Sequence, residues 1–177
     1  MQARYYNNMS YLSVNKYLIP IIMETQFTWK NRFFRSDYEI SRYDGIAGEL
    51  KNIGWKRKAA GELNGKKVLF EIKGFFDKDF LISNPDDNSL IGKIVFNTWR
   101  TKATITILDK VYNWQYDNFF HTKWSISNEN GSLVKYESHF KNGDVNSFVS
   151  DEILILAGLY IRKYLQQRAA ASATAAT

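Results

Sequence analysis

Three carboxylates that lie close together in the chain are the first candidates for chemistry. Glu71, Asp77 and Asp79 fall in one short segment, and hydrolytic reactions often use two carboxylates whose pKa values are separated. However, Phe70 and Ile72 alternate with Glu71, so in a strand Glu71 points to the opposite face from these apolar side chains. We therefore expect Glu71 to face solvent, and the segment does not favour an acid/base pair.

Two histidines and no cysteine narrow the remaining catalytic and metal chemistry. His121 and His139 both lie near expected turns, and a general base there would need a partner that the sequence does not identify. Without cysteine there is no disulfide, thiolate metal site or cysteine nucleophile, and two histidines are too few for an imidazole-rich metal site. The segment 86–88, Asp-Asp-Asn, lacks the EF-hand spacing and is expected to be a turn. No glycine-rich phosphate loop or Ser-His-Asp pattern is present, so we expect a protein that is not an enzyme and holds no metal or cofactor.

The charge of the chain favours an anionic partner. The formal net charge is +6 and the isoelectric point is about 9.4, a balance typical of proteins that meet phospholipid headgroups or nucleic acid. The same charge also keeps many small domains soluble, so it indicates a class of partner without establishing one.

Length and composition predict a single domain rich in β-structure. The chain has 177 residues, 45% of them hydrophobic and 16% aromatic, and large aromatic side chains suit the pleated surface of a sheet. The longest apolar run, residues 153–161, is far shorter than the ~20 residues that a membrane-spanning helix needs. The apolar cluster at residues 17–23 contains Pro20 and lacks a cleavage pattern, so it is expected to be a strand and not a signal peptide. We expect a cytoplasmic protein, placed at most peripherally at a membrane.

Alternating apolar residues separated by turn residues predict consecutive hairpins. Asn64-Gly65 is the clearest turn, because both residue types accept positive φ, and it should pair residues 56–63 with 67–73. The expected strands are 17–23, 27–34, 38–42, 46–50, 56–63, 67–73, 79–83, 90–96, 103–108, 112–116, 122–126, 133–138 and 145–149. A domain with about twelve such strands is a barrel or a sandwich, since an open sheet of that size would curl.

Residues 151–167 break the strand pattern and predict a helix. Ser150 or Asp151 can cap its start, and Arg162, Lys163 and Arg168 complement its carboxyl end. Residues 153–161 are apolar on all sides, so this helix must be enclosed, and its length suits threading a barrel. The domain is expected to span residues 10–168. The tail 169–177, rich in Ala, Ser and Thr, is expected to be a linker, a cloning remnant or a frayed extension of the helix.

The order of these segments resembles the tubby-like superfamily, which includes the tubby C-terminal domain, the LURP-one-related proteins and the phospholipid scramblases. The segments that carry the resemblance are 67–72 (KVLFEI), 80–83 (FLIS), 90–96 (LIGKIVF) and 152–161 (EILILAGLYI). The resemblance implies a closed antiparallel barrel of twelve strands around a central hydrophobic C-terminal helix. It also implies a role in binding phosphoinositide or another phospholipid, as several members do. The chain lacks the calcium-binding and cysteine-rich features of scramblases, so scramblase activity is not expected.

The candidate ligand-binding residues are cations expected at the edge of such a barrel. They are Lys56, Arg57 and Lys58, expected to share an edge with Lys66 and Lys67 across the Asn64-Gly65 turn, and Arg100 with Lys102 at a later turn. Charges of this kind also simply solvate strand ends, and phosphate attraction would be sensitive to salt.

Two other functions remain open at this point. A small-hydrophobic-ligand barrel of the lipocalin kind needs a hollow interior, which a central helix would fill. A nucleic-acid-binding barrel needs exposed aromatic and basic residues on one face. The aromatic candidates for such a stacking platform are Trp99, Tyr112, Trp114, Tyr116, Phe119, Phe120 and Trp124.

Overall fold

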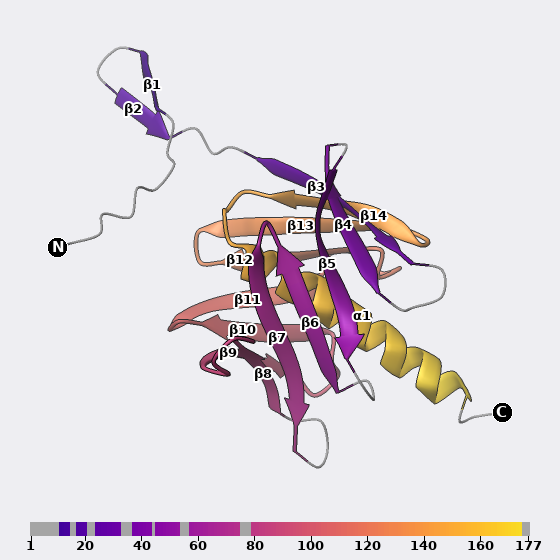
Figure 1. Ribbon diagram of the computed structural model, residues 1–177. Helices are drawn as coiled ribbons and strands as arrows, with labels where there is room; N and C mark the ends of the chain where they lie inside the picture. The colour runs from indigo at the N-terminus through magenta and orange to yellow at the C-terminus, as the bar shows by residue number, and fades with distance from the viewer. Residues whose placement is uncertain are drawn as a thin grey trace.

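The protein is a closed β-barrel with one helix inside it (Figure 1). The computed structural model describes residues 11–14, 17–20, 24–32, 37–43, 45–53, 57–74 and 79–174. The barrel strands of the first half are β3 (Thr25–Asn31), β4 (Tyr38–Arg42), β5 (Gly45–Ile53), β6 (Lys58–Leu63), β7 (Lys66–Lys73) and β8 (Asp79–Ser83). Those of the second half are β9 (Leu90–Phe96), β10 (Lys102–Ile107), β11 (Lys110–Tyr116), β12 (Lys123–Asn128), β13 (Gly131–His139) and β14 (Asn142–Ser147), followed by the helix α1 (Glu152–Thr174).

The twelve barrel strands confirm the expected fold class and follow the chain around the barrel. Each strand pairs antiparallel with the next one in sequence, and β14 pairs with β3 to close the ring. At the β6–β7 turn Asn64 and Gly65 both have positive φ, 50° and 79°, as the hairpin dipeptide predicts. Along β6 and β7 the inward residues are buried while their neighbours are more exposed, which is the alternation that the sequence shows. In β4 and β12 three consecutive residues are buried.

One predicted strand does not belong to the barrel. The segment expected at residues 17–23 forms β2 (Tyr17–Pro20), which pairs only with β1 (Tyr11–Val14) in a separate two-stranded sheet. Residues 21–23 lie outside the described part of the chain. The apolar pattern predicted the strand correctly, but a local pattern does not specify the strand's pairing partner.

The barrel wall encloses α1 from several directions. Every residue from Ile153 to Ile161 is buried. Tyr160 stacks on Phe70 of β7 with ring centroids 4.3 Å apart, and on another side Tyr136 of β13 donates a hydrogen bond to the Ile155 carbonyl at 3.1 Å. The helix begins with Asp151, whose Oδ1 accepts the Leu154 amide at 3.0 Å, so Asp151 is the N-cap. The all-apolar segment is therefore a core element with strand side chains on every side.

The helix approaches β13 so closely that one position requires glycine. A Cβ added at Gly158 would lie 2.3 Å from the Tyr136 hydroxyl and 2.5 Å from the adjacent ring carbon. The Tyr136 ring cannot move away easily, because its hydroxyl donates hydrogen bonds to the Leu154 and Ile155 carbonyls of the helix. The helix can lie against β13 only because this residue has no side chain.

The helix continues farther than its hydrophobic pattern does. It ends at Thr174 rather than near residue 167, so most of the tail expected to begin at residue 169 is helical. Residues 168–174 are exposed and add no buried surface. Alanine has the highest helix propensity, which extends the helix without packing.

Near the point where α1 leaves the barrel, one charged group is buried in the helix–wall contact. Lys163 is 3% exposed, and its Nζ donates to the Leu50 carbonyl at 3.1 Å and lies 3.8 Å from Asp37 Oδ1. Burial lowers the pKa of Lys163 to about 8, although the Asp37 carboxylate opposes the shift.

Replacing Gly158 with Ala should destabilise the fold. The new methyl group clashes with Tyr136, and overpacking of this kind costs about 1–3 kcal/mol even though Ala favours a helix. Urea unfolding of Gly158→Ala should show a lower midpoint. Gly45→Ala is the matched control, since a Cβ there meets only the Arg42 carbonyl oxygen at 3.9 Å. Equal midpoints for the two variants would contradict the close helix–wall contact.

Stability should rise with pH between about 8 and 9.5 because of Lys163. In this range the unfolded chain keeps this lysine protonated, with its ordinary pKa of 10.5, while the folded protein releases the proton. Above about pH 10 the trend reverses, because burial raises the pKa of Tyr38 to about 12 and raises that of Tyr136 as well. Urea titrations at several pH values should show the rise in the wild type and lose it in Lys163→Met. A rise of the same size in that variant would assign it to another group.

Candidate functional site

The two ends of the barrel are chemically different. At the entry end α1 begins, and Asn64 of the β6–β7 turn donates to Glu152 at 3.2 Å. At the exit end α1 leaves the barrel, and Arg100 of the β9–β10 loop hydrogen-bonds to the hydroxyl of Tyr164. Because consecutive strands are antiparallel, the exit end carries the loops β3–β4, β5–β6, β7–β8, β9–β10, β11–β12 and β13–β14. The remaining turns lie at the entry end (Figure 1).

The predicted basic residues do not all share one edge. Lys58 lies at the exit end opposite Glu71, whereas Lys66 and Lys67 lie at the entry end beside the Asn64-Gly65 turn. The six residues of β6 separate the two groups by about 16 Å. The expectation that they share a barrel edge is therefore wrong, since residues near a hairpin turn cannot lie beside those at the open end of the same hairpin.

The other predicted cations gather at the exit end. Arg57, Arg100 and Lys102 lie there with Lys58, while Lys56 lies outside the described residues. Arg57 donates to the Gly74 carbonyl at 2.8 Å, so it also holds the β7 end in place.

Glu71 takes part in an ion-pair cluster at the same end. Its carboxylate lies 2.8 Å from the Lys58 ammonium and 3.3 Å from that of Lys73. The hydrogen bond from Lys58 lowers the pKa of Glu71, with a further contribution from Lys73. A carboxylate held ionised between two lysines is poorly suited to act as a general acid.

Two loops at the exit end share one structure and one sequence pattern. They are 97–102, Asn-Thr-Trp-Arg-Thr-Lys, and 118–123, Asn-Phe-Phe-His-Thr-Lys. In the first, Asn97 Oδ1 accepts the Thr101 and Lys102 amides at 2.9 and 3.0 Å. In the second, Asn118 Oδ1 accepts the Thr122 and Lys123 amides, each at 3.0 Å. We call them the twin loops; their repeated Asn-x-aromatic-x-Thr-Lys pattern is visible in the sequence and was not among the predicted sites.

The twin loops turn their fourth residue back toward the barrel and their aromatic residues outward. Arg100 and His121 have positive φ, 54° and 56°. Arg100 lies over the Phe96 ring, and His121 stacks on Tyr116 with ring centroids 3.9 Å apart. The fourth residue therefore anchors each loop to the barrel, while the third is left at the tip.

Among the residues that the structure describes, the exposed aromatics of the exit end lie on three loops. Trp99 is 84% exposed, Phe119 90% and Phe120 81%, and Phe140 of the β13–β14 loop is 89% exposed. We call these four residues the aromatic rim. By contrast, Trp114 and Trp124 are fully buried in the core, so the predicted stacking platform is divided between the interior and the loop tips.

Charge separates the two ends in the same way as the aromatic rings. Among the described residues of the entry-end turns, the charged side chains are all acidic: Asp86, Asp87, Asp109, Glu129 and Asp151. Four cations flank these turns in the strands: Arg42, Lys66, Lys67 and Lys110. The exit end carries a larger set of exposed cations at or beside its loops, namely Arg57, Lys58, Lys73, Lys102, Lys123 and Lys141, with the carboxylates Asp79 and Asp117 among them. The excess positive charge of the chain is thus concentrated where the aromatic rim lies.

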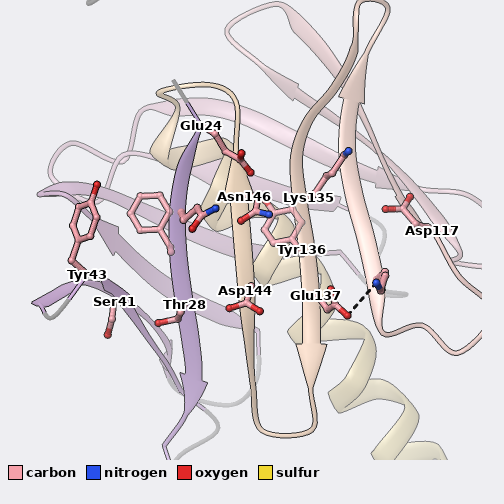
Figure 2. A pocket seen from close by; sticks show the side chains of 13 residues that line it. Glu24, Thr28, Ser41, Tyr43, Asp117, Lys135, Tyr136, Glu137, Asp144 and Asn146 are labelled. Carbon is pink, nitrogen blue, oxygen red and sulfur yellow. Dashed lines mark ion pairs between the residues drawn. The ribbon is translucent and has the colours of Figure 1, made fainter. Parts of the chain in front are cut away.

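A groove of about 760 Å³ runs along the outside of the barrel across β3, β13 and β14. Figure 2 shows the polar side chains that line it, among them Thr28, Glu137 and Asp144, with a dashed line at the Glu137 ion pair. Glu137 lies 3.2 Å from Lys123, Asp144 lies 3.0 Å from His139, and Asp117 accepts a hydrogen bond from Ser125. The groove can offer hydrogen bonds, but these three carboxylates already have partners.

The predicted turn at residues 86–88 is a turn. Asn84 accepts the Asp86 amide and Asp87 accepts the Ser89 amide, as Asx turns do. Within the described part of the chain no group of three or more His, Cys, Asp or Glu residues could hold a metal ion. Among the described helices none is long and apolar enough to cross a membrane.

No protein-family model, curated protein or solved structure matches this chain.

The twin-loop asparagines should determine the order of their loops. Asn97→Ala removes the acceptor for two backbone amides, at a cost of about 1–2 kcal/mol, and should speed hydrogen exchange at Thr101 and Lys102. Asn97→Asp keeps the acceptor oxygen and should keep most of the protection. If both variants exchange alike, the side-chain cap is not what orders the loop.

Proposed function

We propose that this domain is a non-enzymatic, tubby-like barrel that docks on membranes containing anionic phospholipid through its exit end. The observation that carries the proposal is the separation of charge along the barrel axis, with acidic turns at the entry end and lysines and arginines at the exit end. The closed twelve-stranded barrel around a helix agrees with the architecture that the tubby-like resemblance implies.

The separated charges favour one orientation at a negative surface. Each lysine close to an anionic bilayer contributes about 1 kcal/mol, and the attraction decays over about one Debye length. Lys102, Lys123 and Lys141 lie on neighbouring loops and would reach the surface together. The acidic turns would then lie at the far end of the barrel, where repulsion from the lipid is weakest.

Nucleic acid is a second candidate, because exposed aromatics and cations lie at the same end of the barrel. The arrangement favours lipid. Bases stack on rings that line one continuous groove, whereas Trp99, Phe120 and Phe140 occupy three separate loop tips. The interior that a lipocalin-like ligand would need is filled by α1.

The test is co-sedimentation with vesicles of phosphatidylcholine alone, with phosphatidylserine, or with phosphatidylinositol bisphosphate. The variant Lys102→Ala/Lys123→Ala/Lys141→Ala should weaken binding to anionic vesicles on the order of 100-fold and reduce its salt dependence. These lysines are preferred to Arg57, whose loss would also disturb the β7 end.

The matched control is Lys66→Ala/Lys67→Ala/Lys110→Ala, which removes the same charge from the entry end. This control should bind like the wild type. Equal losses in the two variants would show that net charge acts without orientation. Failure to bind any anionic vesicle would overturn the proposal, and tighter binding of single-stranded DNA at matched salt would replace it with the nucleic-acid function.

A further inference from the structure

We infer that the aromatic rim enters the interfacial layer of the bilayer, so that docking combines ring insertion with attraction between lysines and lipid phosphates. This inference rests on the proposed function and adds to it the part of the lipid that is contacted. Its members are Trp99, Phe119, Phe120 and Phe140.

The loops that carry the rim are neighbours around the barrel. Strands β10, β11, β12 and β13 follow one another in the ring, so the β9–β10, β11–β12 and β13–β14 loops project side by side. Successive loops of this kind are separated by two strand spacings, about 10 Å. The four rings therefore lie on three neighbouring loops at one end of the barrel, where one flat surface would meet them.

Local hydrogen bonds and backbone conformation keep the rings exposed to solvent. In each twin loop the asparagine fixes the backbone and the positive-φ residue folds back on the barrel, which leaves the aromatic side chain at the tip. Phe140 itself has positive φ, 65°, an unusual conformation for a bulky residue. Exposed apolar groups that are ordered in this way mark a surface of interaction.

Charge complementarity identifies the surface as an anionic bilayer. Lys102 and Lys123 end the twin loops, and Lys141 follows Phe140 directly. Rings beside lysines match the membrane interface, where aromatic side chains lie at headgroup depth and ammonium groups reach phosphate. Among the residues that the structure describes, Lys102 forms no ion pair, so its ammonium group is available to lipid phosphate.

The carboxyl end of α1 leaves the barrel at the same end. Its exposed last turns contain Arg168 and then only Ala, Ser and Thr up to residue 174. This segment extends about 10 Å at 1.5 Å per residue and carries no acidic side chain. It would enter the same interfacial layer without opposing the contact.

Trp99 supplies the direct readout. Vesicles of phosphatidylcholine and phosphatidylserine, with or without brominated phosphatidylcholine, would be added to the whole protein. Trp55 lies outside the described residues, so it is replaced by Phe in both proteins that are compared. Bromine should quench a component of the tryptophan fluorescence of Trp55→Phe, and this component should be absent from Trp55→Phe/Trp99→Phe, because Trp29, Trp114 and Trp124 are buried in the protein. Sedimentation without quenching would overturn insertion and leave the proposed function intact. Absence of sedimentation would instead reject the proposed function.

A second variant separates ring insertion from charge. Phe119→Ser/Phe120→Ser/Phe140→Ser should weaken vesicle binding by at least about tenfold while leaving its salt dependence unchanged. Tyr43→Ser/Leu90→Ser/Leu108→Ser removes exposed apolar side chains from the entry end and should bind like the wild type. Because all six residues are exposed, thermal unfolding should be nearly unchanged in both. Unaltered vesicle binding by the first variant would overturn the inference and point to a protein partner for the rim.

Discussion

The enclosure of α1 is the constraint on which the rest of the structure depends. Residues 153–161 have no polar face, so water must be excluded from every side of the helix. A ring of twelve strands is wide enough to hold a helix, and its inward side chains fill the space that remains. Contact is so close that Gly158 lies directly against Tyr136. With the interior filled, specific recognition has to use the outer wall or the loops.

The helix also makes the two ends of the barrel different. It starts at the entry end with an aspartate cap and acidic turns nearby. At the exit end its residue Tyr164 packs against Phe80 of the barrel wall. Arg100 contacts both Tyr164 and Phe96, so one twin loop is attached directly to the helix. The position of an exposed ring is thereby linked to the core, and the loop needs no contact of its own with a ligand to stay ordered.

The sequence was most informative where local chemistry decides structure. Period-two alternation gave the bounds of β4, β8 and β9 as observed, and Asn64-Gly65 gave its hairpin. The separate pairing of β2 could not be read, because pairing depends on distant residues. The helix was predicted to end at residue 167 because its apolar pattern ends there. The high helix propensity of alanine extends α1 to Thr174 without any packing contact. The prediction that Lys66 and Lys67 share an edge with Lys58 was already inconsistent with the predicted hairpin, because a turn at Asn64-Gly65 sets Lys58 opposite Glu71. The twin loops were likewise visible as a repeated pattern.

The exposed rings and Lys102 locate function at the exit end better than the size of the groove does, although Lys58, Lys73 and Lys123 at that end have carboxylate partners. In the groove, Glu137 pairs with Lys123, Asp144 lies 3.0 Å from a His139 ring nitrogen and Asp117 accepts a hydrogen bond from Ser125, so a ligand would have to displace contacts that the protein makes with itself. At the exit end the rings have no cover in the described part of the protein, and Lys102 has no acidic partner there. A surface gains most from binding where its apolar area is still wet and its charges are not yet neutralised. The entry end also exposes apolar side chains, but acidic turns surround them, so an anionic surface is attracted to the end of the barrel from which the helix emerges.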